Sequence, residues 1–332
     1  MVYRPYDQQL VMNMIDYNIY ACGPTLYSDV HIGNARPLVL FDVVAEYYRR
    51  IGRNVKYARN ITDVDDKIIS LCGDQHPGDW VKAHTLPAFR DVEKYLGLLP
   101  PDVEPFASDY IEQMHDMISE LIGKGFASLQ VHGDESGIYF KSELATTYGR
   151  LSNRQTKQNF ALWKTVSDES GEYVWKSPWG TGRPGWHTEC AAMIRSIFNG
   201  PVDLHGGGTD LTFPHHENED VQCMCAYNHP VAKSWLRNSH LLVDGKKMAK
   251  SDGNFITVKS LMSDWSGSAV RHMLLKTNPN RPIDFTFKLL AESEKIVTRK
   301  PLAALPTDQP WNNEQLQALA QNFNTSLASM RG

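Results

Sequence analysis

Cysteine is scarce in this chain, and long apolar stretches are missing. Five cysteines in 332 residues are too few for a disulfide-stabilised secreted scaffold, which favours a reducing compartment. No apolar run approaches the ~20 residues of a membrane-spanning helix. The first residues lack the charged and apolar pattern of a signal peptide. We therefore expect a cytoplasmic protein that has no membrane partner.

An excess of positive charge is missing as well, because the formal net charge is −4. This balance argues against a dominant nonspecific nucleic-acid surface, although a local basic strip would be enough for tRNA. Hydrophobic residues make up 42% and charged residues 22% of the chain, as in ordinary globular proteins. The length allows two or three domains with proper cores.

Chemistry-bearing residues gather in the segment 206–219, which begins with three glycines. Pro214 suits the first turn of a helix, where its missing N–H is not needed. His215 and Glu219 then lie four residues apart on one helix face, a spacing that suits two ligands of one divalent metal. Further candidate ligands come from two distant segments: Cys22 and Cys190. The sequence thus predicts a zinc site of two thiolates, one imidazole and one carboxylate.

Five sequence blocks, taken in order, resemble the catalytic half of cysteinyl-tRNA synthetase. They are Cys22-Gly23-Pro24-Thr25-Leu26-Tyr27, His31-Ile32-Gly33-Asn34, Asn60-Ile61-Thr62-Asp63-Val64-Asp65-Asp66-Lys67, Gly182-Arg183-Pro184-Gly185-Trp186-His187 and Lys247-Met248-Ala249-Lys250-Ser251. The match covers roughly residues 18–300. The combination is specific, although a block such as the four residues from His31 would be weak alone.

The apolar patterns predict an α/β fold. Residues 17–23 and 55–61 have the pattern of strands, and residues 34–51 that of an amphipathic helix, closed by Gly52. Strand, helix and strand in this order open a parallel nucleotide-binding sheet. A second helix is predicted over residues 108–124, closed by Gly125.

The resemblance extends this prediction to a Rossmann-like parallel sheet of a class I synthetase, with a connective insertion and a C-terminal helical extension. Residues 100–180 are rich in loops and are similar to the insertion. The expected division is 1–100 with 181–238 for the catalytic domain, 101–180 for the insertion, 239–300 for the lysine-loop region and 301–332 for the start of a helical bundle.

The chain departs from the family pattern in several places. The family has a longer stretch between its Leu-Ser-Gly-Arg-like segment, here Leu151-Ser152-Asn153-Arg154, and the following Phe160-Ala161-Leu162-Trp163-Lys164. In the lysine loop, Ala249 replaces the usual serine. The sequence also ends within the expected helical bundle and lacks the anticodon-reading region. We expect that it is a fragment of a longer synthetase and not a natural truncation.

ATP is expected at the start of the first long helix. The helix dipole and backbone N–H groups favour anions there, and Gly33 allows a close approach. His31 and Asn34 add side-chain donors, and Asn34 stands where the family often has a second histidine. Lysines on a mobile loop can clamp the triphosphate, and backbone glycines can lie against the adenosine. These residues are Lys247, Lys250, Gly206 and Gly207.

The amino-acid pocket is expected beside the metal. Asp210 is the candidate for the substrate ammonium, with a turn aspartate bonded to its own backbone as the equal alternative. The resemblance implies that Thr62 and Trp186 line this pocket. We expect His216 and Glu217 to be structural, Cys223 and Cys225 to pack in the core, and Cys72 to be a loop residue. The aspartates after Thr62 are expected to make local loop hydrogen bonds: Asp63, Asp65 and Asp66.

The resemblance implies ATP-dependent activation of L-cysteine to cysteinyl-AMP and transfer to the acceptor end of tRNA. One zinc ion is expected, with Mg²⁺ accompanying ATP, and a monomer is expected. Two alternatives remain. A stand-alone ligase, like the cysteine ligase of mycothiol biosynthesis, would use an amino-sugar amine as acceptor. A non-catalytic paralogue would only sense cysteine or bind a partner.

Overall fold

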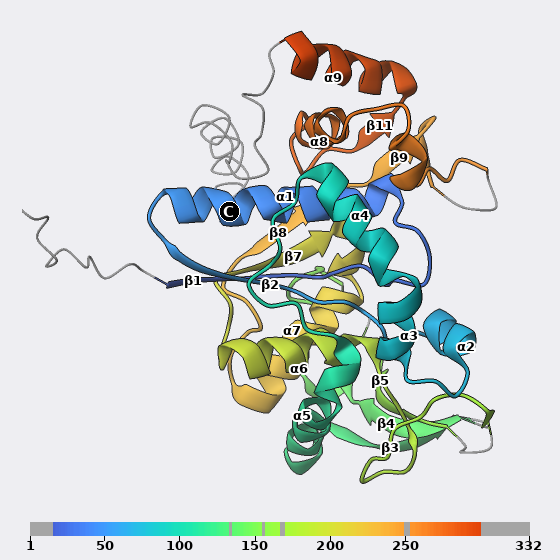
Figure 1. Ribbon diagram of the computed structural model, residues 1–332. Helices are drawn as coiled ribbons and strands as arrows, with labels where there is room; N and C mark the ends of the chain where they lie inside the picture. The colour runs from blue at the N-terminus through green and yellow to red at the C-terminus, as the bar shows by residue number, and fades with distance from the viewer. Residues whose placement is uncertain (1–15, 133–134, 155–156, 167–169, 249–252, 300–332) are drawn as a thin grey trace, which may run out of the picture.

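Four parallel strands in the order β2-β1-β7-β8 form the central sheet of the computed structural model (Figure 1). The structure describes residues 16–132, 135–154, 157–166, 170–248 and 253–299. The strands are β1 (Asp16–Ala21), β2 (Asn54–Arg59), β7 (Leu204–Gly208) and β8 (Trp235–Asn238). The predicted parallel sheet is confirmed, and the two predicted strands end within two residues of the observed bounds.

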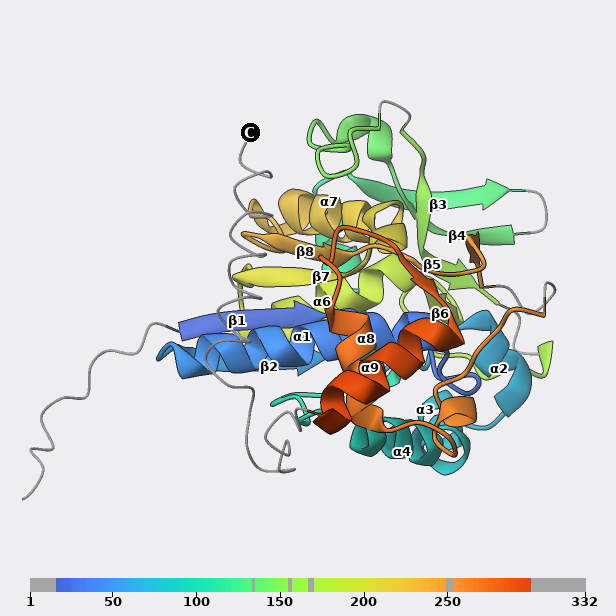
Figure 2. The same cartoon turned by 90° about the horizontal axis from the view of Figure 1, so that it is seen from above.

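Helix α1 (Ile32–Arg50) covers one face of the sheet and is buried on nearly all sides over its first three turns. A layer of α8 (Gly267–Leu275), α9 (Phe287–Arg299), β9 (Leu241–Val243) and β11 (Ile283–Phe285) lies on its other side (Figure 1). Seen from above, α8 and α9 lie across α1 (Figure 2). The helix predicted over residues 34–51 is confirmed, but its buried surface is wider than an amphipathic stripe because two layers pack against it.

Helices α6 (Trp186–Phe198) and α7 (His215–Tyr227) cover the opposite face of the sheet (Figure 1). The insertion lies beyond them. It contains α5 (Ile111–Gly123) and an antiparallel sheet of β3 (Ala127–His132), β4 (Glu135–Phe140), β5 (Phe160–Thr165) and β6 (Gly182–Pro184). The helix predicted over residues 108–124 is therefore present, preceded by the 3-10 turn η1 (Ala107–Tyr110).

The loop-rich character predicted for residues 100–180 holds outside α5 and three short strands, but the antiparallel sheet that these strands form with β6 was not anticipated. Strand β3 alternates apolar and polar residues along its whole length, a strand signal that the sequence analysis did not use. Leu129 and Val131 on this edge strand are nevertheless 62% and 66% exposed. Strand β6 pairs with β5, so residues 182–184 belong to the insertion's sheet.

The remaining elements are short helices, one short strand and 3-10 turns. They are α2 (Asp66–Cys72), α3 (Pro77–His84), α4 (Leu86–Leu96), β10 (Lys246–Lys247), and the 3-10 turns η2 (Ser142–Leu144), η4 (Thr209–Thr212) and η6 (Lys259–Leu261). Cys72 is the buried last residue of α2 and not a loop residue. Lys250, Ala249 and the expected bundle at 301–332 lie outside the described residues. Within the described ranges no helix is long and apolar enough to cross a membrane.

Gly206 allows β7 and β8 to approach each other. A Cβ atom there would lie 1.7 Å from the Leu236 carbonyl oxygen. We expect Gly206→Ala to lower the free energy of unfolding by about 3 kcal/mol, because a backbone atom cannot yield to the methyl group. Chemical denaturation measures the change.

Gly123→Ala is the matched control, since a Cβ at this helical position meets no atom within 4 Å. We expect it to be neutral or to stabilise the protein by about 0.5 kcal/mol. Equal unfolding midpoints for the two variants would contradict the role given to Gly206.

Candidate functional site

A cavity of about 360 Å³ opens at the carboxyl ends of β1 and β7, the edge at which parallel α/β sheets bind ligands. Two groups of side chains line it. The first contains the predicted amino-acid residues and three of the four predicted metal ligands, since Glu219 is not among the lining residues, and the second contains predicted phosphate residues. The lining includes Cys22, Thr62, Trp186, Cys190, Asp210, His215, His31, Gly33, Asn34 and Lys247.

The four predicted metal ligands meet in the first group. Cys22 directly follows β1, and its N–H donates to the Gly206 carbonyl at 3.0 Å. Cys190 comes from α6, and His215 and Glu219 come from the first turns of α7. All four are buried, and one ligand atom from each lies within 4.8 Å of the others. The structure therefore brings together thiols, an imidazole and a carboxylate from segments almost 200 residues apart.

The distances suit a tetrahedral ion. Ligands of tetrahedral zinc lie about 3.3–3.8 Å from one another. The Cys22 sulfur lies 3.8 Å from Glu219 Oε1, and His215 Nε2 lies 2.7 Å from the same oxygen. Only the second distance must widen, by about half an ångström. Thiolate, imidazole and carboxylate together match the ligand preference of zinc.

The protonation of these four side chains also suits a divalent metal ion. A hydrogen bond with Cys22 lowers the pKa of Cys190 to about 6, although burial acts in the opposite direction. Burial, and then Cys190, raise the pKa of Cys22 well above its usual value. Burial also opposes a charged His215, but Glu219 and Cys190 outweigh it and raise the pKa of His215 to about 10. A dication would replace the protons on Cys22 and His215.

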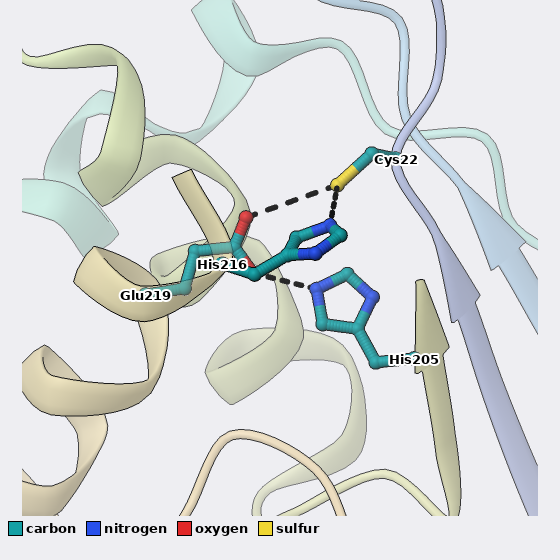
Figure 3. Close-up of side chains that lie close together, drawn as sticks. All are labelled: Cys22, His205, His216 and Glu219. Carbon is teal, nitrogen blue, oxygen red and sulfur yellow. Dashed lines mark hydrogen bonds and ion pairs between the residues drawn. The ribbon is translucent and has the colours of Figure 1, made fainter. Parts of the chain in front are cut away.

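A second potential metal group shares Cys22 and Glu219 and adds His205 and His216 (Figure 3). His205 Nδ1–H donates to the Tyr20 carbonyl at 2.9 Å, and Nε2 lies 2.5 Å from Glu219 Oε2. Neither histidine lines the cavity. His205 thus holds the oxygen of Glu219 that does not face His215.

His216 is also occupied by protein partners. Its Nδ1 accepts from Arg237 Nε at 3.2 Å, so its ring proton is on Nε2, which lies 3.6 Å from the Cys22 sulfur. Burial lowers the pKa of His216 well below its usual value, so the ring is neutral. A nitrogen that carries a proton cannot bind a metal. The arrangement supports the structural role expected for His216, whereas His205 was not anticipated.

Asn60 and His187 are two further residues that contact the predicted metal ligands and that the sequence analysis did not single out. Asn60 Oδ1 accepts from Gly23 N at 2.9 Å and lies 3.8 Å from the Cys190 sulfur, while its Nδ2 donates to Thr62 Oγ1 at 3.0 Å. Both residues lie within the quoted sequence blocks, which was the available signal. Their buried partners were not visible in the sequence.

His187 fixes the orientation of His215. Their Nδ1 atoms are 3.1 Å apart. Burial lowers the pKa of His187 to about 3, with His215 acting in the same direction. A neutral His187 accepts the Nδ1 proton of His215, which leaves His215 Nε2 toward Cys22 and Glu219.

The predicted amino-acid residues lie around the first group. Thr62 is buried, whereas Trp186 is 43% exposed and stacks on the His215 ring with centroids 4.1 Å apart. Asp210 is exposed on η4. Of the neighbouring aspartates, Asp65 makes the expected local contact, accepting from Lys67 N at 2.9 Å. The other two have distant partners instead: Asp63 accepts from Ser108 N at 3.0 Å, and Asp66 pairs with Arg183 at 3.2 Å.

The start of α1 differs from the expected anion site. His31 caps the helix, and its Nδ1 accepts from the N–H groups of Gly33 and Asn34 at 3.1 and 3.3 Å. Ile32 N donates to the Ile256 carbonyl at 3.0 Å. These amides are therefore already paired, and the ring proton of a neutral His31 is on Nε2. Any stabilisation of phosphate here comes from side chains and the helix dipole.

Glycines and lysines complete the second group. A Cβ on Gly33 would lie 2.8 Å from the Met248 methyl carbon and 2.9 Å from the His31 ring. Lys247 lies on exposed β10 and lines the cavity. Gly206 and Gly207 are buried, and Gly208 is the glycine of this run that lines the cavity.

Glu217 attaches the insertion to the helix that carries His215 and Glu219. Its buried carboxylate accepts three backbone N–H groups, from Gly149 at 2.9 Å, Leu151 at 3.0 Å and Ser152 at 2.8 Å. The structural role predicted for Glu217 thus has a specific form, in which a charged acceptor holds residues 149–152 against α7.

Comparisons with known proteins give the family to which the chain belongs. The family model described as tRNA synthetases class I (C) catalytic domain matches residues 8–295. The cysteine–tRNA ligase of Rhizobium leguminosarum bv. trifolii is 40% identical over 361 aligned residues, covering 98% of this chain and 75% of the relative. That of Acholeplasma laidlawii is 43% identical over 296 residues, covering 84% and 67%.

A solved structure supports the fold. The methionyl-tRNA synthetase of Mycobacterium tuberculosis in complex with methionyl-adenylate aligns with a TM-score of 0.70 at 13% identity, covering 88% of this chain and 70% of that chain. At this identity the likeness concerns the fold alone.

We expect Glu217→Gln to lower the free energy of unfolding by about 2 kcal/mol or more, because hydrogen bonds to a charged group contribute about 1.5–3 kcal/mol each. Cleavage by protease within residues 149–152 should become faster. Denaturation curves and peptide mapping measure the two effects. Glu120→Gln, which removes only an exposed ion pair with Lys124 on α5, should change stability by about 0.5 kcal/mol or less. Similar losses in both variants would show that Glu217 does not anchor this loop.

Proposed function

The chain belongs to the class I tRNA synthetase family, and on this premise we propose that it is a cysteine–tRNA ligase. It activates L-cysteine with ATP and transfers the cysteinyl group to the acceptor end of tRNA. The observation that carries the proposal is one cavity lined by Cys22, Cys190 and His215, which meet the buried Glu219 in one ligand group. The same cavity is lined by the start of α1 and by Lys247 of the β9–β10 hairpin, called the lysine hairpin below.

The first group would hold zinc through Cys22, Cys190, His215 and Glu219. Bound there, zinc would take the thiolate of cysteine as a further ligand and so distinguish it from serine, which a hydrophobic pocket does poorly. Glu219 is oriented from behind by His205, and His215 by His187. Such partners fix ligand orientation before substrate arrives.

The remaining polar residues orient the rest of cysteine. The Asp210 carboxylate lies on the cavity wall, exposed and able to pair with the substrate ammonium. Trp186 and Thr62 border the side-chain pocket. These contacts would direct the substrate carboxylate toward the α-phosphate of ATP, whose Mg²⁺ enters with the nucleotide.

Adenylate formation requires no covalent enzyme intermediate. A carboxylate oxygen of cysteine attacks the α-phosphorus, and the bond to pyrophosphate breaks. His31 Nε2–H and the Asn34 amide would donate to phosphate oxygens, while Lys247 and Lys250 would neutralise the departing pyrophosphate. Positioning and charge stabilisation therefore carry the rate.

The acceptor and the domain division follow from the same premise. The relatives reported above are cysteine–tRNA ligases, which favours tRNA over the amine of an amino sugar and over a sensor without activity. Residues 16–100 and 185–238 would form the catalytic domain, because β6 pairs with the insertion's sheet. Residues 239–299 would form the lysine-loop region.

Zinc binding is tested without an activity assay. We expect the purified protein to hold about one zinc per chain, and Cys190→Ser to lose both zinc and cysteine binding, since a hydroxyl is a far weaker ligand than a thiolate. Mass spectrometry and calorimetry measure these. Cys225→Ala should keep both, because Cys225 lies outside the ligand group. Undiminished cysteine affinity in metal-free protein would refute the assignment.

Activation is tested by cysteine-dependent exchange of labelled pyrophosphate into ATP, without tRNA. Serine should be a very poor substitute for cysteine. Lys247→Ala and Lys250→Ala should each lower the rate about 10²-fold, because they remove charge stabilisation of the leaving group, and leave zinc content unchanged. Lys246→Ala is the control, since Lys246 is the neighbouring exposed lysine of β10 and does not line the cavity. Charging of cysteine tRNA then tests the acceptor.

A further inference from the structure

Arg36 is a buried cation whose partners are all backbone carbonyls. It lies on the first turns of α1, two residues beyond Asn34, and is 2% exposed. Its Nη1 donates to the carbonyls of Ser239 at 2.6 Å and His240 at 3.3 Å, and its Nη2 to those of Arg281 at 2.9 Å and Asn278 at 3.3 Å. No carboxylate in the described part of the chain forms an ion pair with it.

Burial without a counter-ion is costly for a guanidinium. Burial lowers the pKa of Arg36 to about 10, which still leaves it charged at neutral pH. A planar fork of five N–H donors is the side chain that can join four carbonyls at once. The four hydrogen bonds offset the cost of burying the charge, and they fix the two segments that carry these carbonyls relative to each other.

The carbonyls belong to two segments that meet beside the cavity. Residues 238–241 line it, and residues 278–283 lead into β11. Ser239 N also donates to the Pro279 carbonyl at 2.7 Å, and Leu241 of β9 is paired with Ile283 of β11. Arg36 thus holds this junction against α1, the helix that begins at the predicted phosphate residues His31 and Asn34.

The lysine hairpin continues directly from this junction. Strand β9 pairs with β10, which carries Lys247. After the hairpin the chain returns to α1: Val258 N donates to the Val30 carbonyl at 2.8 Å, and His31 pairs with Thr257. The hairpin is therefore attached to the start of α1 on both sides, by backbone pairing after it and by Arg36 before it.

We infer that Arg36 is a positioning residue for nucleotide activation: it sets the cavity wall at 238–241 and the lysine hairpin relative to His31 and Asn34. This inference rests on the proposed function, because it takes ATP to lie between these elements. Asn238 adds a further reason. Its Nδ2 donates at 3.2 Å to the same Ser239 carbonyl that accepts from Arg36, so a displacement of this carbonyl would also change the position of a polar side chain of the wall.

The test compares Arg36→Lys with Arg271→Lys. Lysine keeps the charge but offers a single ammonium in place of the fork. Arg271 is equally buried, donates to the carbonyls of Leu96 and Gly97 at 3.3 Å, and pairs with Asp42. None of these partners lines the cavity.

We expect Arg36→Lys to raise the KM for ATP in pyrophosphate exchange about tenfold and to lower kcat, with the KM for cysteine and the zinc content unchanged. Arg271→Lys should leave both KM values unchanged despite a loss of stability. Equal rises in the KM for ATP and cysteine, or an unchanged KM for ATP in Arg36→Lys, would overturn the inference.

Hydrogen exchange gives a readout that does not depend on activity. Arg36→Lys, and Arg36→Met where it folds, should accelerate amide exchange in β9 and leave the amides of β1 unchanged, whereas Arg271→Lys should not accelerate β9. Unaltered exchange in β9 would refute the inference even if the wild-type chain activates cysteine. Absence of exchange into ATP by the wild-type chain, with β9 responding as expected, would instead count against the proposed function.

Discussion

The parallel pairing of β1 with β7 is the constraint on which the site depends. It aligns Ile19 with Leu204 and Ala21 with Gly206, so that Cys22 leaves β1 at the point where β7 enters the glycine run. The glycines let the neighbouring strand come close, and the chain then turns into α7 with His215 and Glu219 on its first turns. One register shift in this pairing would separate the two halves of the site.

The polar side chains buried beside this strand pair form hydrogen bonds and ion pairs mainly with one another. Glu219 contacts His215 through one oxygen and His205 through the other, and Cys22 lies close to both Glu219 and His216. Removing one member would leave a buried charge or donor unpaired, which costs more than the contact itself contributes. The group is therefore fixed in place before any ligand arrives, as selective metal sites require.

Helix α1 joins this rigid group to the more exposed lysine hairpin. Because a layer packs on each side of it, polar side chains such as Arg36 and Asp42 are buried along with its apolar ones. Its first residues pair with the chain on the far side of the hairpin. The segments before and after the hairpin are therefore held by the same packed helix.

The sequence by itself determined the class of fold, because strand, helix and strand in its first 60 residues follow clear apolar patterns. It also pointed to the four residues of the metal group, because their types and the four-residue spacing of His215 and Glu219 are local properties. It could not place Asn60, His187 or His205, since a buried polar side chain is defined by partners that are distant in sequence. The insertion's sheet was missed although β3 alternates apolar and polar residues, because its strands are short and their pairing with one another is not written in any one segment. Only the tertiary structure decided that His31 pairs with the amides at the start of α1, and that Arg36 joins two remote segments. Contacts of this kind depend on how layers pack, and no periodicity along the chain records them.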